Sequence, residues 1–195
     1  MAVRQRHGIL ALEGDWDDGL IQTTSIKGMV DLLRAGNEVP VIHYKVRNLK
    51  VLKEILKEWE RHQKKYPIIY LTGHGSAGAI QLAGDKNEVK LTQIGRILGE
   101  LKLKAPVFLI VGACDALKIS KQEMQQFFTL APKVSGLLGY EKSVDFIEAT
   151  AFELILLDKA AAQPNFKKAS LVKLHQELMK LARPLSRRLK RVLYA

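Results

Sequence analysis

Short apolar runs alternate along this chain with longer segments in which apolar residues recur every three or four positions. The short runs predict strands that are buried on both faces, and the longer segments predict amphipathic helices. The predicted strands cover residues 7–13, 39–46, 67–72, 105–112 and 134–140, with a small extra strand at 79–83.

Cap and turn residues stand where these helical segments should begin or end. Gly36 and Asn37 predict the end of the first helix, whereas Asn48, Thr92 and Asp145 are predicted N-caps of later helices. The predicted helices cover residues 20–35, 49–59, about 92–103, 121–130, 144–161 and 167–193.

This alternation of strand and helix predicts an α/β fold. Strands buried on both faces need cover on both, so we expect a three-layer sandwich with a mostly parallel sheet between helices. A chain of 195 residues is long enough for one domain with a substantial core. No repeat and no low-complexity linker divides it, so a single domain is expected over residues 1–195.

Composition narrows the class of protein further. Hydrophobic residues make up 47% of the chain, which is typical of globular rather than disordered proteins. No apolar run approaches the roughly 20 residues that cross a bilayer, and residues 1–15 lack the features of a secretory signal. The single cysteine, Cys114, precludes an intrachain disulfide and a cysteine-based zinc cluster. We therefore expect a cytoplasmic protein with neither a bound metal nor a cofactor.

The positive charge of the chain is concentrated near its C-terminus. Of the net charge of +11, residues 164–195 contribute +8, because this segment contains nine lysines and arginines and a single acid, Glu177. Apolar residues form one stripe along the predicted helix 167–193, which Pro184 should kink or split. The stripe comprises Leu171, Leu174, Leu178, Leu181, Leu185, Leu189 and Val192.

We expect this basic helix to dock on the sheet through its stripe and to leave its charged face in water. The alternatives are that this face binds an acidic protein, nucleic acid or an anionic membrane surface. No aromatic residues are interleaved with the basic ones, which argues against single-stranded nucleic acid.

Two chemically reactive residues follow predicted strands. His74 lies in a Gly-His-Gly turn after strand 67–72, and Cys114 follows strand 105–112. Sites in open parallel sheets form at the carboxyl ends of the strands, where these side chains would converge if the strands are neighbours. Singly, each residue has a plainer interpretation as a structural histidine or a small buried hydrophobe. Together they predict a catalytic pair, in which the imidazole activates the thiol, with the N–H groups of Gly75 and Cys114 as the oxyanion hole.

The segments YLTGHGSAGAIQL and VFLIVGACDAL resemble the caspase-like cysteine peptidases, and among these the bacterial CHAT-type domains. The similar order of elements covers about residues 7–160. This resemblance implies a caspase-like fold with His74 as general acid and base, Cys114 as nucleophile and Gly75 in the oxyanion hole. Only the Ala-Cys core of the caspase signature is present, so a preference for acidic substrates is not implied.

The candidate substrate-binding residues are acids near the same edge of the sheet. Glu13, Asp15, Asp17 and Asp18 follow the first strand, and Asp115 follows Cys114. Several caspase-like peptidases use a pocket acid to select Lys or Arg before the scissile bond, so Glu13, Asp15 and Asp115 are predicted substrate contacts. A solvated acidic turn is the plainer interpretation of the first four.

The leading hypothesis is thus a cysteine endopeptidase that cleaves proteins or peptides and is controlled by a separate regulatory partner. The alternative is a catalytically silent caspase-like fold that binds through its basic C-terminal helix. A Cys-nucleophile amidase is disfavoured, because Ala116 stands where the usual second glycine of its nucleophile turn would be.

Overall fold

The computed structural model describes residues 6–16, 24–82, 88–189 and 191–195. Its larger sheet has six strands, and their order across the sheet is 2-1-3-7-8-9 by their place in the chain. All neighbouring strands are parallel except the last pair. These strands are β1 (Ile9–Glu13), β2 (Val41–Lys45), β3 (Ile68–Thr72), β7 (Val107–Gly112), β8 (Val134–Tyr140) and β9 (Arg191–Tyr194).

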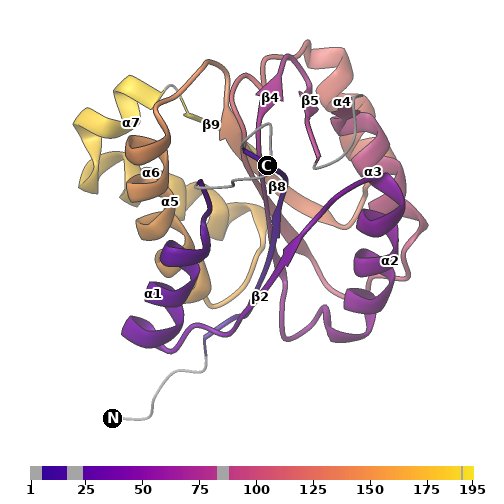
Figure 1. Cartoon of the computed structure of the whole chain (residues 1–195), viewed down its shortest axis with the longest axis horizontal. Helices are drawn as coiled ribbons and strands as arrows, with labels where there is room; N and C mark the ends of the chain where they lie inside the picture. Colours follow the sequence, from indigo (N-terminus) through magenta and orange to yellow (C-terminus); the bar gives the residue numbers. More distant parts are fainter. Residues whose placement is uncertain (1–5, 17–23, 83–87, 190) are drawn as a thin grey trace.

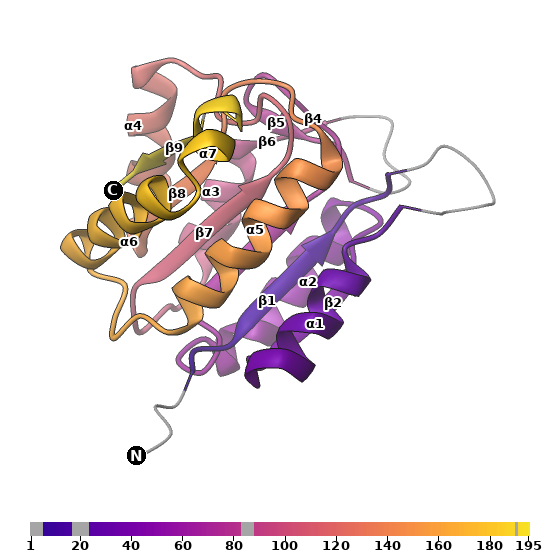
Figure 2. The ribbon, with the colours of Figure 1, turned by 90° about the vertical axis from the view of Figure 1, so that its left-hand side faces the viewer.

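Helices cover both faces of this sheet, so the predicted three-layer α/β sandwich with a mostly parallel sheet is confirmed (Figure 1). One layer consists of α2 (Leu49–Trp59), α3 (Leu91–Glu100) and α4 (Lys121–Leu130), with a short 3-10 turn at Glu60–His62. The other layer consists of α1 (Lys27–Asn37), α5 (Phe146–Ala161), α6 (Lys168–Leu181) and α7 (Arg183–Leu189), which lie in front of the sheet in Figure 2.

Two hydrophobic cores form because successive strand residues point to opposite faces of the sheet. Leu10 and Leu12 of β1 pack with α2 and α3, whereas Ile9 and Ala11 pack with α1 and α5. A small antiparallel sheet of β4 (Gly75–Ser76), β5 (Ala79–Ile80) and β6 (Val89–Lys90) follows β3. Only β5 corresponds to a predicted strand, the short one at 79–83.

Side-chain caps fix the start of two helices as predicted. Asn48 Oδ1 accepts a hydrogen bond from the N–H of Val51 at 2.9 Å, and Asp145 Oδ1 accepts one from the N–H of Glu148 at 2.9 Å. The prediction was wrong for Thr92, because α3 already begins at Leu91.

The first helix is also displaced from its predicted range of 20–35. Helix α1 begins at Lys27 and continues through Gly36 to Asn37. It ends at Glu38, whose left-handed backbone (φ 52°) lets its N–H donate to the carbonyl oxygen of Leu33. Residues 20–23 of the predicted range lie outside the described part of the chain.

The C-terminal segment is not one helix over 167–193. Helix α6 ends at Leu181 and α7 begins at Arg183, so the predicted split next to Pro184 is confirmed. The prediction was wrong beyond α7, because residues 191–194 form β9, antiparallel to β8. Val192 therefore belongs to a strand. The leucine spacing of a helix continues to this point, but pairing with the edge of β8 decides the conformation.

Most of the apolar stripe docks as expected, while one of the basic residues is not on a solvated face. The buried stripe residues are Leu171, Leu174, Leu178 and Leu189, whereas Leu181 is 63% exposed. Arg191 is only 7% exposed, and the centre of its guanidinium group lies 3.8 Å from the centre of the Phe152 ring. The charge pattern could not distinguish this buried arginine from its solvated neighbours.

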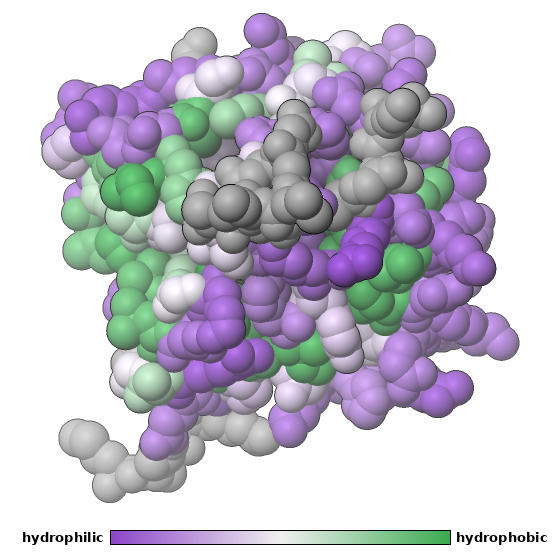
Figure 3. Space-filling model, in the orientation of Figure 1, coloured by the Kyte–Doolittle hydropathy of each residue, from purple (hydrophilic) through white to green (hydrophobic). Residues whose placement is uncertain are grey.

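The two helical layers present different surfaces. Figure 3 shows mainly hydrophilic residues over α2 and α3, and apolar residues on the side where α1 and α5 lie. Leu32 of α1 and Ile147 of α5 are 54% and 71% exposed. None of the helices in the described residues has the length and apolar character that a membrane span requires.

Candidate functional site

Two strands that lie side by side carry the predicted catalytic pair at their carboxyl ends. β3 and β7 are parallel, and Thr72 of β3 lies beside Gly112 of β7. His74 and Cys114 each follow two residues later, and both line one pocket of about 380 Å³. The structure therefore brings the two residues to one cavity at the carboxyl edge of the sheet.

Segments far apart in the sequence form the walls of this pocket. The connection from β1 to α1 contributes Trp16, and the first half of α5 contributes Phe146 and Glu153. The ring of Trp16 makes edge-on contacts with the rings of His74 and Phe146, at centroid distances of 5.6 and 5.1 Å. Trp16 thus lies between the His74 turn and the start of α5.

Gly75 packs so closely on Cys114 that a side chain would not fit. A β carbon at Gly75 would overlap the carbonyl oxygen of Cys114 and would lie 3.1 Å from its backbone nitrogen. Only glycine permits this approach. The turn that carries His74 therefore lies directly against the backbone of Cys114. The role of the Gly75 and Cys114 N–H groups in an oxyanion hole stays a prediction.

A backbone carbonyl orients the imidazole of His74. Its Nε2 atom lies 2.6 Å from the carbonyl oxygen of Trp16. Because a carbonyl oxygen only accepts, Nε2 is the donor and carries a proton. In the neutral ring, Nδ1 is then the nitrogen with a free electron pair, which is the form that a general base requires.

The thiol of Cys114 is held by the loop before α5. The N–H of Val144 donates to Sγ at 3.3 Å, and the thiol donates to the Val144 carbonyl oxygen at 3.7 Å. These two contacts fix the place of the sulfur atom at the edge of the pocket. His74 and Cys114, both in the described part of the chain, are not hydrogen-bonded to each other. Catalytic contacts of this kind commonly tighten only when substrate binds.

Glu13 does not line this pocket, although it was a predicted substrate contact. The residue is fully buried, and its carboxylate makes four hydrogen bonds. Burial alone would raise the pKa of Glu13, but the hydrogen bonds from His43, Ile26 and Ser25 outweigh it and lower the pKa. The carboxylate is therefore fully engaged within the protein and is not presented to a substrate.

The other predicted acids are also absent from the pocket wall, as far as the structure describes it. Asp15 is half-buried, and Asp17 and Asp18 lie outside the described residues. Asp115 has a left-handed backbone (φ 55°), and its side chain accepts a hydrogen bond from the Ser143 hydroxyl at 3.0 Å. That contact joins the Cys114 turn to the loop before α5, so Asp115 supports the site from outside.

The carboxyl group that does line the pocket belongs to Glu153 of α5. It is 3% exposed, and its oxygens accept hydrogen bonds from the hydroxyls of Tyr70 at 2.5 Å and Tyr140 at 2.8 Å. A β carbon at Gly112 would lie 2.7 Å from Oε1 of Glu153. The missing side chain at Gly112 therefore leaves the space that this carboxyl group fills.

Opposing effects act on the pKa of Glu153, and burial is the largest of them. Burial raises its pKa above the ordinary value of 4.5, while the two tyrosine hydroxyls and the positive charge of Arg191 act in the opposite direction. Arg191 reaches this region from β9, and its Nε atom has no hydrogen-bond partner among the described residues. A further cation in the pocket would favour the charged carboxylate.

The pattern of the sequence did not single out Trp16, Val144 or Glu153. Glu153 does carry a signal, because it is the sole acid in the otherwise largely apolar segment 149–157 of α5. Trp16 and Val144 hold His74 and Cys114 through backbone atoms, and no side-chain pattern indicates such contacts.

The fold and the site define a three-layer α/β protein with a partly aromatic pocket at the carboxyl edge of its sheet. The chain belongs to DUF6642, a family of unknown function whose model matches residues 6–194. No curated protein matches it. It is similar to the crystal structure of a protein from Burkholderia pseudomallei K96243 described as pilus assembly-related. The identity is 13% and the TM-score 0.40, over 85% of this chain and 99% of that one.

Proposed function

We propose that this protein is a cysteine peptidase of the caspase-like type, with Cys114 as nucleophile and His74 as general acid and base. The observation that carries this proposal is that both residues line one pocket, while Gly75 packs on the backbone of Cys114. The resemblance of the sequences around His74 and Cys114 to caspase-like peptidases, CHAT-type domains in particular, supports the same assignment. A lone cysteine that must stay reduced fits a cytoplasmic location.

In the proposed mechanism Nδ1 of His74 takes the proton of the Cys114 thiol, while Nε2 stays bonded to the Trp16 carbonyl. The thiolate attacks the peptide carbonyl carbon, and the oxygen that becomes negative is stabilised by the N–H groups of Gly75 and Cys114. The imidazolium then protonates the leaving amine, which gives a thioester. Water, deprotonated by His74, hydrolyses the thioester and restores the thiol.

The chemistry of the pocket favours a cationic side chain before the scissile bond. Glu153 provides a carboxyl group in the pocket wall, and Trp16 and Phe146 provide aromatic surface. A lysine or arginine gains from a carboxylate and from aromatic faces together. We therefore still propose a preference for Lys or Arg before the scissile bond, but with Glu153 as the recognising acid in place of the acids that follow β1.

Alkylation of Cys114 by iodoacetamide tests the catalytic pair without a known substrate. Cys114 is the sole cysteine, so labelling reports on this site alone. In the His74→Ala variant we expect Cys114 to be alkylated about tenfold more slowly at pH 7, because the thiolate loses its imidazolium partner. His62→Ala is the matched control, since His62 lies outside this pocket. Equal rates in the wild type and His74→Ala would overturn the pair and favour the silent binding module.

A peptide library tests hydrolysis and its specificity. Cleavage should vanish in Cys114→Ala with little change in melting temperature, because the lost volume is small. Glu153→Gln should reduce the preference for Lys and Arg over Met by at least about tenfold while keeping the shape of the pocket. Glu148→Gln is its control, because Glu148 lies on the same helix but pairs with Arg188. A preference for Asp in the wild type would contradict this subsite.

A further inference from the structure

The carboxylate of Glu13 fastens both ends of the connection from β1 to α1. On one side its Oε1 accepts a hydrogen bond from the indole N–H of Trp16 at 3.0 Å. On the other side the backbone N–H of Ile26 and the hydroxyl of Ser25 donate to the same carboxylate, at 2.9 and 3.0 Å. The Glu13 side chain thus holds Trp16, near the start of this connection, together with Ser25 and Ile26 at its end.

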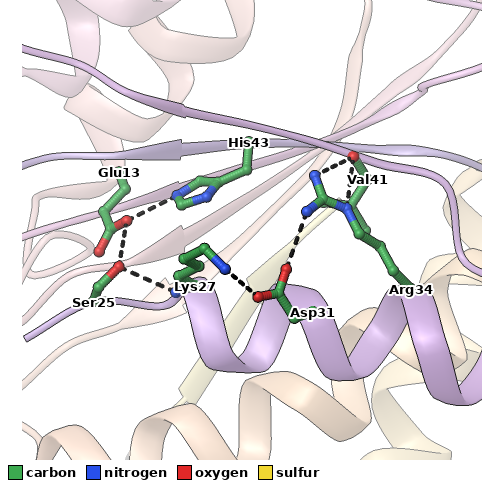
Figure 4. A network of polar contacts seen from close by, with 7 residues as sticks. All are labelled: Glu13, Ser25, Lys27, Asp31, Arg34, Val41 and His43. Atoms are coloured by element: carbon green, nitrogen blue, oxygen red, sulfur yellow. Dashed lines mark hydrogen bonds and ion pairs between the residues drawn. The ribbon is translucent and has the colours of Figure 1, made fainter.

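A fourth contact ties this carboxylate to the edge strand β2. Nε2 of His43 lies 2.8 Å from Oε2 of Glu13, and Figure 4 shows the imidazole pointing at the carboxylate that also receives Ser25. The Glu13 side chain is fully buried and that of His43 is 14% exposed. Buried carboxylates with every oxygen engaged hold their partners in one geometry, because breaking any contact leaves an unpaired polar group.

Trp16 transmits this geometry to His74 through two contacts. Its carbonyl oxygen accepts a hydrogen bond from Nε2 of His74 at 2.6 Å, and its ring lies edge-on to the imidazole. The indole N–H that is fastened to Glu13 and the carbonyl that orients His74 belong to the same residue. The position of the indole therefore sets where that carbonyl lies.

We propose that Glu13 is a positioning residue for the peptidase reaction, which holds His74 in its active tautomer and place by fixing Trp16. This proposal rests on the proposed function. Glu13 touches neither substrate nor thiol; it acts through Trp16 alone. Its end of β1 is already held by backbone pairing with β2 and β3, so this strand does not depend on the hydrogen bonds that the carboxylate makes to the connection.

The test is the pH dependence of Cys114 alkylation by iodoacetamide in the folded protein. Glu13→Gln keeps the shape of the side chain but puts an amide donor where acceptors are needed, and Trp16→Phe keeps the ring contacts but removes the indole N–H. Both variants should move the midpoint of the rate profile to higher pH by about half a unit or more, which is roughly threefold in thiolate at neutral pH. Asp31→Asn is the control, because Asp31 is exposed and pairs with Lys27 and Arg34 on the same helix (Figure 4).

The outcomes separate this proposal from the proposed function. If His74→Ala shifts the profile but Glu13→Gln and Trp16→Phe only lower the melting temperature, Glu13 is structural and the positioning role is overturned. If His74→Ala itself leaves the profile unchanged, the catalytic pair fails first. Should Glu13→Gln not fold, Trp16→Phe decides alone, because Glu13 then keeps its bonds to Ile26, Ser25 and His43.

Discussion

The site is shaped as much by missing side chains as by reactive ones. Gly75 lets the His74 turn lie on the backbone of Cys114, and Gly112 leaves the space that Glu153 occupies. At both positions a β carbon would meet an oxygen atom at less than van der Waals distance. The spacing between Cys114, His74 and Glu153 thus depends on two glycines that have no side chain to clash.

Replacing Gly75 tests this spacing. Gly75→Ala should lower stability by about 1–3 kcal/mol, since the turn must move away from Cys114 to relieve the overlap. It should also slow alkylation of Cys114, because His74 moves with the turn. Gly28→Ala is the control, for nothing lies within 4 Å of its added carbon on α1. In the Gly28→Ala variant Cys114 should be alkylated at the wild-type rate, and the stability should be unchanged or slightly higher. Chemical denaturation and labelling rates measure both effects.

Residue identity and position relative to strands were enough to predict that His74, Gly75 and Cys114 meet. The acid that lines the pocket could not be predicted in the same way. Glu13 ends a strand and so points to the correct edge, but donors on the connection to α1 take up its carboxylate. Glu153 reaches the pocket from the interior of a helix, where an acid is placed by tertiary packing rather than by local pattern.

The bounds of a helix or strand could be predicted where cap or turn residues stand next to it in the sequence. Helix α4 runs over Lys121–Leu130 as expected, because Ser120 and Glu123 cap its first turn reciprocally. Strand β8 likewise spans Val134–Tyr140 between clear turn residues. The strands β4 and β6 have two residues each, which is too short for a period to show. Strand β9 depends on pairing with the distant strand β8, which the periodicity of a short segment does not reveal.

The fastening of β1, β2 and the connection to α1 by Glu13 should make stability depend on pH. Its lowered pKa means that the folded state favours the carboxylate, so this contribution is fully present above the ordinary value of 4.5. It is lost as the pH falls through the lower pKa of the folded protein. The difference in unfolding free energy between the wild type and Glu13→Gln should therefore be largest near neutral pH and shrink below about pH 4.5.

Urea denaturation at a series of pH values measures this difference. Glu58→Gln serves as the comparison, because its side chain is 67% exposed and pairs with Arg61 at the surface. Exposed pairs of this kind contribute little to stability. A Glu13→Gln variant whose deficit stays constant from neutral to acidic pH would show that packing, rather than the ionised carboxylate, accounts for the loss.

At the scale of the whole molecule, the last strand links the edge of the sheet to the base of the pocket. β9 covers the edge of β8 through four residue pairs. It also inserts Arg191 beside the rings of Phe152 and Tyr140, and the charge of Arg191 acts on Glu153. The basic C-terminal segment is thus partly a component of the core and partly a solvated surface. The net charge of this segment did not indicate which of its basic residues are buried and which are solvated.

Removing residues 191–195 tests this dual role. The truncated chain should lose at least about 2 kcal/mol of stability, because it forfeits the stacking of Arg191 on Phe152 and the burial that β9 provides. It should also self-associate, since the uncovered edge of β8 presents unpaired backbone groups. The variant Arg187→Gln removes one positive charge, as the truncation does, but should stay monomeric and nearly as stable, because the Arg187 side chain is exposed. Thermal melting and light scattering on the three proteins distinguish these outcomes. A truncated chain that melts like the wild type and stays monomeric would mean that β9 is dispensable and that Glu153 does not depend on Arg191 for its place in the pocket.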